Sequence, residues 1–212
     1  MSLIGKTLNN VKTKHDFNAN RLKTKELSII CNCCLGGMLY RDLGLRFLSP
    51  TIKLNIPFDD FLKFVSHLPY YKDMPIKPCE PLIREFEQLG GGSMVEFPCG
   101  SCDDIRILFQ HYGSFDEAKE KWETRAKRID LNNTVIVFLT WGNVSEELIR
   151  QFLSLPYKKV MFVDDPKKTD GKTVFHLTVP EDKHWFDIDE KRSKYNTRHY
   201  YDQFNWIKFF NK

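Results

Sequence analysis

Residues 135–139 form a run of five apolar side chains, Val-Ile-Val-Phe-Leu, which is the length of a single β-strand. A strand without alternating polar residues is typical of a parallel sheet that is covered on both faces. Residues 27–31 and 160–163 have the same character, and residues 145–155 have the apolar spacing of a helix. Strands that alternate with helices in this way predict an α/β fold, with a mainly parallel sheet in a three-layer α/β/α arrangement.

The first half of the chain also holds elements of both kinds. Residues 51–56 alternate between apolar and polar, and they predict a strand that leads into a helix over residues 61–68. Residues 94–97 and 104–109 predict the two strands of a hairpin, which turns at residues 98–101.

The second half contains a recognisable helix start. Ser114 and Glu117 have the spacing of a capping box, in which each side chain accepts a hydrogen bond from a free amide, and they predict a helix that runs to about residue 129. An edge strand over residues 173–178 and a short amphipathic helix within residues 200–210 complete the expected elements.

A length of 212 residues suits one domain, which we assign to residues 25–212. Its irregular part is an excursion over about residues 69–93, which holds four prolines and a Gly-Gly-Gly triplet. Residues 1–24 form a basic segment that predicts a helix, either solvated or resting on an anionic membrane surface. A formal net charge of +4 gives only mild attraction for anions, and we expect no nucleic-acid partner.

The chain has no recognisable signal peptide and no apolar run that is long enough to span a membrane, so we expect a cytoplasmic protein. Peripheral contact with the inner membrane is the alternative that the basic segment allows. Six cysteines in a chain of this length are expected as reduced thiols. A zinc site of Cys31 and Cys33 with Cys99 and Cys102 is disfavoured by the tight spacing of the first pair, and no metal site is predicted.

The turn at residues 31–37, Cys-Asn-Cys-Cys-Leu-Gly-Gly, is the candidate functional site. Gly36 and Gly37 let the backbone approach a ligand, and the free amides that open the next helix favour a phosphate or an oxyanion. Cys34 is a candidate nucleophile because a helix amino terminus favours the thiolate, although a small buried packing residue is the alternative. Asn32 needs a hydrogen-bond partner, which is either the turn itself or a ligand. The spacing matches no cofactor-binding motif, so the cofactor stays unassigned.

His111 ends the alternating stretch that follows Asp104. It is a candidate general base for Cys34, with Asp104 as the acid that orients it, and a surface loop histidine is the alternative. Trp141 and the pair Asp164-Asp165 follow buried strands, so their polar groups are expected at the same edge of the sheet.

Short motifs follow one another in a fixed order from about residue 20 to the end of the chain. They are residues 28–37, Tyr40 to Leu45, Ser49-Pro50-Thr51, Asp104-Ile105, His111-Tyr112, Glu117-Ala118, Lys121-Trp122, Arg128-Ile129, Leu155-Pro156-Tyr157 and Tyr200 to Trp206. In these motifs the chain resembles a bacterial family that is catalogued as a domain of unknown function and linked to exopolysaccharide and capsule biosynthesis. In the family pattern an asparagine precedes the matched cysteine and a tryptophan follows it, where this chain has Cys33 and Leu35.

The resemblance implies an enzyme that modifies a surface-polysaccharide precursor, most plausibly by moving an acyl or glycosyl group. Its partner is then a sugar or polysaccharide precursor, and Tyr40, Arg41 and Tyr112 join the candidate substrate-binding residues. A non-catalytic module that binds a sugar nucleotide or a polysaccharide is the alternative.

Overall fold

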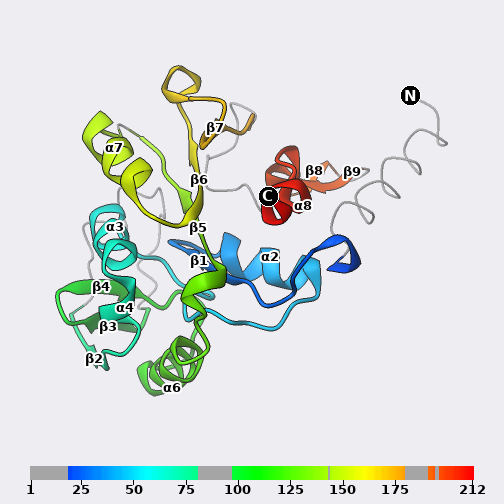
Figure 1. Ribbon diagram of the computed structural model, residues 1–212. Coiled ribbons are helices and arrows are strands. Elements are labelled where there is room, and N and C mark those ends of the chain that lie inside the picture. Colours follow the sequence, from blue (N-terminus) through cyan, green and yellow to red (C-terminus); the bar gives the residue numbers. More distant parts are fainter. Residues whose placement is uncertain (1–18, 81–96, 143, 180–190, 194–195) are drawn as a thin grey trace.

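The computed structural model describes residues 19–80, 97–142, 144–179, 191–193 and 196–212. Their centre is a four-stranded sheet in which every pair of neighbouring strands is parallel, as the apolar runs predicted (Figure 1). The strands, in their order across the sheet, are β1 (Ser28–Cys31), β5 (Thr134–Leu139), β6 (Lys158–Val163) and β7 (Val174–His176). All six residues of β5 are buried, which confirms a central strand that is covered on both sides.

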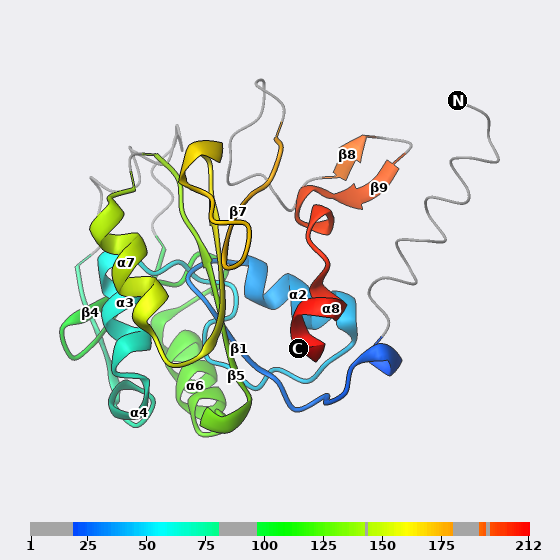
Figure 2. The same cartoon turned by 45° about the horizontal axis from the view of Figure 1, so that its top comes forward.

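Successive side chains of a strand point to opposite faces of the sheet, so the apolar strands present side chains on both faces. Helices pack against each of these faces (Figure 2). Ile29 and Val137 lie on the face that is covered by α2 (Leu35–Leu43) and α8 (Trp206–Asn211). Ile30 and Ile136 lie on the other face, with side chains from three helices: α3 (Phe58–Ser66), α6 (Phe115–Ala126) and α7 (Glu146–Ser154).

A second, antiparallel sheet packs on the α3 side of the molecule. Its strands are β2 (Ile76–Pro78), β3 (Cys99–Cys102) and β4 (Ile105–Leu108), with the short helix α4 (Leu68–Tyr71) before β2. A hairpin does form here, but its turn lies at Asp103 and Asp104, so the prediction of a turn at residues 98–101 was wrong. Its first strand is residues 99–102, whereas most of the predicted strand over residues 94–97 lies outside the described residues. Asp103 adopts a φ of 55°, which aspartate tolerates better than most residues.

The reason for the displaced turn is the role of Gly100, which marks close packing and not a change of chain direction. A Cβ atom at this position would lie 2.9 Å from the ring of Phe109 and 3.0 Å from that of Phe115. Only glycine lets β3 approach these two rings so closely.

Residues 51–56 were predicted as a strand and are instead an irregular connection. Asn55 makes a single antiparallel bridge with Leu108, and Lys53 adopts a φ of 59°, which interrupts an extended strand. The same segment also contacts the parallel sheet, because the Ile56 amide donates to the carbonyl of Asn32, at the end of β1, over 2.8 Å. It thus joins the parallel sheet to the antiparallel one.

Side-chain caps define the helix starts. Ser114 Oγ accepts from the Glu117 amide over 3.2 Å, while the Glu117 carboxylate accepts from the amide of Gly113, one residue before the expected partner. This helix, α6, ends at Ala126 and not near residue 129. Ser145 caps α7 in the same way through the amide of Leu148.

The remaining elements are short. They are the 3-10 turns η1 (Ala19–Arg21), η2 (Leu131–Asn133), η3 (Pro166–Lys168) and η5 (Tyr200–Gln203), and the hairpin strands β8 (Lys191–Ser193) and β9 (Asn196–His199). Most of the predicted amino-terminal helix and the second half of the excursion, residues 81–93, lie outside the described residues. Among the described helices, none has the length and apolar character that crossing a membrane requires.

Candidate functional site

The chain leaves the carboxyl ends of the adjacent strands β1 and β5 toward opposite faces of the sheet. After β1 it enters α2 on one face, and after β5 it enters α7 on the other (Figure 2). In open parallel sheets, ligands bind where neighbouring connections diverge in this way. The candidate site therefore consists of residues 32–34 and 140–142 with the side chains that surround them, and we call it the loop site.

Asn32 holds the two halves of the loop site together. Its side chain is fully buried, with Nδ2 donating to the Leu139 carbonyl over 2.9 Å and Oδ1 accepting from the Leu139 amide over 3.0 Å. The carboxamide thus extends the pairing of β1 with β5 by one more residue. These two contacts satisfy the need for a hydrogen-bond partner that the sequence indicated for Asn32. The partner is the backbone of Leu139, within the protein.

Tyr40 protects the outer edge of β1. Its hydroxyl donates to the Leu27 carbonyl and accepts from the Ile29 amide, both over 2.8 Å, while Thr51 Oγ1 accepts from the Cys31 amide over 3.0 Å. Burial raises the pKa of Tyr40 well above its ordinary value. An edge strand with unpaired backbone groups can pair with a strand of another chain. The hydroxyl groups of Tyr40 and Thr51 reduce this risk because they occupy backbone groups at the edge of β1.

The two glycines of the turn allow α2 to pack closely. A Cβ atom on Gly36 would lie 2.8 Å from the Cβ of Cys31, and one on Gly37 would lie 3.3 Å from a methyl group of Ile52. Gly36 is therefore required for the contact between α2 and β1, in addition to any role of its amide toward an anion.

Cys34 occupies the position just before α2 and is half-buried. Its sulfur lies 3.9 Å from Gln110 Oε1 and 4.0 Å from the Leu54 carbonyl oxygen. Both oxygens are hydrogen-bond acceptors toward which the Cys34 thiol can donate. Cys31 and Cys33 lie on the other side of the turn with their sulfurs 3.8 Å apart, and the pKa of Cys33 is raised by this hydrogen bond and by burial.

His111 is exposed, and Gln110, immediately before it, makes the contact with Cys34. The structure does not bring Asp104 to His111. Asp104 precedes β4 and His111 follows it, so about 13 Å of extended chain separates them. Hydrogen bonds from Tyr71 and from Lys63 occupy Asp104 and hold its pKa below the ordinary value.

Tyr112 and Arg41 have partners within the protein. The Tyr112 hydroxyl donates to the Ile52 carbonyl over 2.8 Å and accepts from Arg125 over 2.8 Å. Arg41 is exposed and forms an ion pair with Asp42 over 2.8 Å, and Asp42 accepts a hydrogen bond from Tyr201. Tyr112 thus anchors the loop after β4, and Arg41 belongs to the contact between α2 and η5.

Trp141 and Asp164, which the sequence placed at this edge, do lie there. The Trp141 ring packs edge-on against Phe58, with 4.6 Å between ring centroids, and Asp164 accepts from the Gly142 amide over 2.6 Å. Phe58 and Gln110 were missed by the sequence reasoning. Gln110 lies in the turn after β4, which ends at Leu108, so the alternation of side chains along a strand gives no signal for it.

The six cysteines are free thiols, and the described residues hold no group of three or more His, Cys, Asp or Glu side chains placed to bind a metal ion. The loop site is thus a turn that Asn32 holds in place. Cys34 and Gln110 lie on one side of it, and Trp141, Phe58 and Asp164 lie on the other.

Comparison with known proteins gives two matches. A family model described as "Domain of unknown function (DUF1919)" matches residues 5–211. A protein of Haemophilus influenzae, described as "Uncharacterized protein", is 30% identical over 192 residues, which is 90% of this chain and 87% of that protein. The family match covers nearly the whole chain, including both strands that carry the loop site. The chain therefore belongs to the DUF1919 family.

Proposed function

We propose that this protein acts in surface-polysaccharide biosynthesis, where it binds a sugar precursor at the loop site and transfers an acyl or glycosyl group to or from it. The resemblance of the sequence motifs supports the pathway. The observation that carries the site is the pair Trp141 and Phe58 beside Asp164, at the point where the connections from β1 and β5 diverge.

A sugar ring presents an apolar face of C–H groups and a rim of hydroxyls, so its binding site needs an aromatic surface with polar groups beside it. Trp141 is half-buried and is held by the edge of Phe58, which fixes the plane of its ring. Asp164 uses Oδ2 to hold the Gly142 amide, and its carboxylate has further lone pairs that can accept from a sugar hydroxyl. An aromatic ring with a carboxylate beside it suits a small sugar precursor better than a folded protein partner.

In this proposal Cys34 lines the site, and His111, which lies in the turn after β4, is the candidate general base. A nucleophilic role for Cys34 requires that its sulfur attack an acyl donor, release the donor's leaving group and then pass the acyl group to a sugar hydroxyl. The Cys34 sulfur lies near the oxygens of Gln110 and Leu54, and the attack requires that the thiol proton pass to a base.

The second candidate is a non-catalytic module that binds a sugar nucleotide or a polysaccharide within a biosynthetic complex. It is favoured by the separation of Asp104 from His111, because Lys63 and Tyr71 hold the acid that was expected to orient the base. Both candidates place the ligand at the same site and in the cytoplasm.

The test compares Trp141→Ala, Cys34→Ser and Cys34→Ala with wild type in a bacterial strain that lacks the gene, by measuring the amount and substituents of the surface polysaccharide. Trp141→Ala is expected to reduce the product by up to about tenfold, because an aromatic contact worth about 1.5 kcal/mol is lost. Tyr70→Ala is the matched control, since Tyr70 is an exposed aromatic residue that bonds to Asp103.

The three results separate the candidates. Loss of the substituent in both Cys34 variants supports nucleophilic transfer, and retention in both supports a lining role. A wild-type product in Trp141→Ala, with the variant folded, contradicts the proposal.

A further inference from the structure

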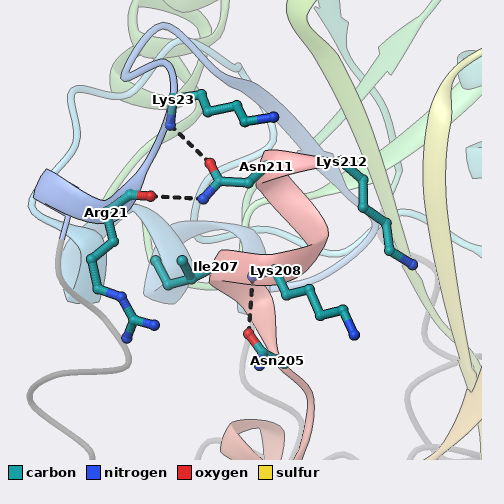
Figure 3. A pocket seen from close by; sticks show the side chains of 7 residues that line it. All are labelled: Arg21, Lys23, Asn205, Ile207, Lys208, Asn211 and Lys212. Atoms are coloured by element: carbon teal, nitrogen blue, oxygen red, sulfur yellow. Dashed lines mark hydrogen bonds between the residues drawn. The ribbon is translucent and has the colours of Figure 1, made fainter.

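A basic pocket lies between the segment that precedes β1 and the helix α8. Its volume is about 420 Å³. Four of the seven residues that line it are cations, namely Arg21, Lys23, Lys208 and Lys212, and none of the seven is acidic. All four cations are exposed, two from each segment (Figure 3).

Asn211 fixes the two segments to one another. Its Oδ1 accepts from the Lys23 amide over 2.8 Å, and its Nδ2 donates to the Arg21 carbonyl over 2.7 Å, as Figure 3 shows. Trp206 and Phe210 are buried in the core below, so α8 cannot shift without breaking that packing. The cations therefore stand on a rigid base, which lowers the entropic cost of binding a ligand.

Within the described part of the chain, no acidic side chain pairs with the three lysines of this pocket, Lys23, Lys208 and Lys212. The carbonyl end of a helix carries roughly half a negative charge, which cannot balance three ammonium groups. Burial, and then the charge of Lys23, lower the pKa of the neighbouring Lys158.

We propose that this pocket binds a phosphate-bearing ligand. Lysine ammonium groups are common phosphate ligands and act as point charges, so they need no fixed planar geometry. Asn205 adds a neutral donor, because its Oδ1 accepts from the Lys208 amide and leaves the NH₂ group for a phosphate oxygen. The volume lies in the range of small-molecule sites and exceeds what a single inorganic phosphate fills.

The pocket is separate from the loop site. It adjoins Lys158 at the start of β6, whereas Asp164 follows the end of the same strand. The six residues of β6 span about 17 Å, too far for one phosphate group to serve both sites. The ligand is therefore either a soluble diphosphate compound or the headgroup of an anionic phospholipid, and the basic sequence of residues 6–25 adds to the attraction for either.

The experiment uses the full chain with two probes: inorganic pyrophosphate, titrated by calorimetry, and phosphatidylglycerol vesicles, tested by co-sedimentation against neutral phosphatidylcholine vesicles. Lys23→Ala/Lys208→Ala/Lys212→Ala should weaken binding about 100-fold, since each lysine near an anionic surface contributes about 1 kcal/mol, which is about a fivefold change in affinity. The matched control is Lys77→Ala/Lys121→Ala/Lys127→Ala. It removes the same charge from β2, from α6 and from the residue that follows α6, on the other side of the parallel sheet.

Saturable binding of pyrophosphate by wild type, lost in the pocket variant, supports a soluble diphosphate ligand. Binding to phosphatidylglycerol vesicles alone, lost in the same variant, supports a lipid headgroup. The proposal is overturned if wild type binds neither probe, or if the pocket and control variants lose affinity equally. Lys208→Glu, a single exposed substitution with no packing role, provides a second variant that should weaken binding without unfolding the protein.

Discussion

The carboxamide of Asn32 pairs with both backbone groups of Leu139, so that one side chain continues the parallel sheet beyond the last residue of β1. Removing it leaves a buried amide and a buried carbonyl without partners. We expect Asn32→Ala to lower the free energy of unfolding by about 3 kcal/mol, because each unsatisfied buried group costs about 1–3 kcal/mol. Urea unfolding followed by circular dichroism measures this change.

Asn132→Ala is the control for that prediction. Asn132 is exposed, so its substitution should change the unfolding free energy by less than about 0.5 kcal/mol. Equal stability of Asn32→Ala and wild type would show that water replaces the carboxamide at the strand ends.

Gly36 should tolerate alanine poorly, whereas Gly37 should tolerate it better. The new Cβ atom at position 36 would lie 2.8 Å from the Cβ of Cys31, and neither atom can move without a shift of α2 against β1. At position 37 the nearest atom is a side-chain methyl group of Ile52, 3.3 Å away. We expect Gly36→Ala to cost about 2 kcal/mol and Gly37→Ala less, as thermal unfolding would measure. An equal effect of both variants would contradict this account of the turn.

Tyr40→Phe tests the protection of the β1 edge. The substitution keeps the ring but removes the hydroxyl that bonds to Leu27 and Ile29. We expect a loss of about 2 kcal/mol in unfolding free energy and faster aggregation on heating, because two edge backbone groups become unpaired. Light scattering during a thermal ramp reports the second effect.

Tyr70→Phe is the control, since its hydroxyl is exposed and bonds to Asp103 at the molecular surface. The interpretation of Tyr40 fails if both variants behave alike.

Cys102 gives a prediction about alkaline pH. Burial, with smaller contributions from Asp103 and Asp104, raises the pKa of this thiol to about 12 from an ordinary value of 9.0. The folded state thus keeps its proton where the unfolded state loses it, so this contribution to stability is complete below pH 9 and falls as the pH rises toward 12. Wild type should therefore lose more stability than Cys102→Ala between pH 8 and about pH 10.5, in urea unfolding at each pH.

The same thiol should resist alkylation. Iodoacetamide at pH 8 reacts with the thiolate, so folded wild type should show negligible labelling at Cys102 by mass spectrometry, and urea should restore it. Rapid labelling of Cys102 in the folded protein would disprove the raised pKa.

The parallel sheet was predictable because its strands are continuous apolar runs, and the buried run at residues 135–139 proves to be the central strand β5. The hairpin turn was not predictable in the same way. Proline and glycine at residues 98 and 100 resemble a turn, yet Gly100 is needed for a contact with Phe109 and Phe115 that only tertiary packing creates. Local sequence cannot distinguish these two uses of glycine.

The candidate site was also predictable only in the features that depend on neighbouring residues in the sequence. The turn at residues 31–37 and its place at the carboxyl edge of the sheet follow from the order of strand and helix. The partner of Asn32 is 107 residues away, and Gln110 reaches Cys34 from the end of another sheet. Contacts between residues so far apart in the sequence depend on how the two sheets pack together. The periodicity of apolar residues along the chain does not determine that packing.

The bonds from Asn211 to residues 21 and 23 have a consequence for how the chain is made. The strands that α8 covers are all synthesised before it, so the part of this sheet face that α2 leaves uncovered, including Phe162, stays open until α8 has left the ribosome. Most of the protein must therefore wait in a partly collapsed state with this surface exposed, a state that chaperones recognise. A ribosome stalled before residue 206 should hold a protease-sensitive nascent chain, and completion of α8 should make the core resistant.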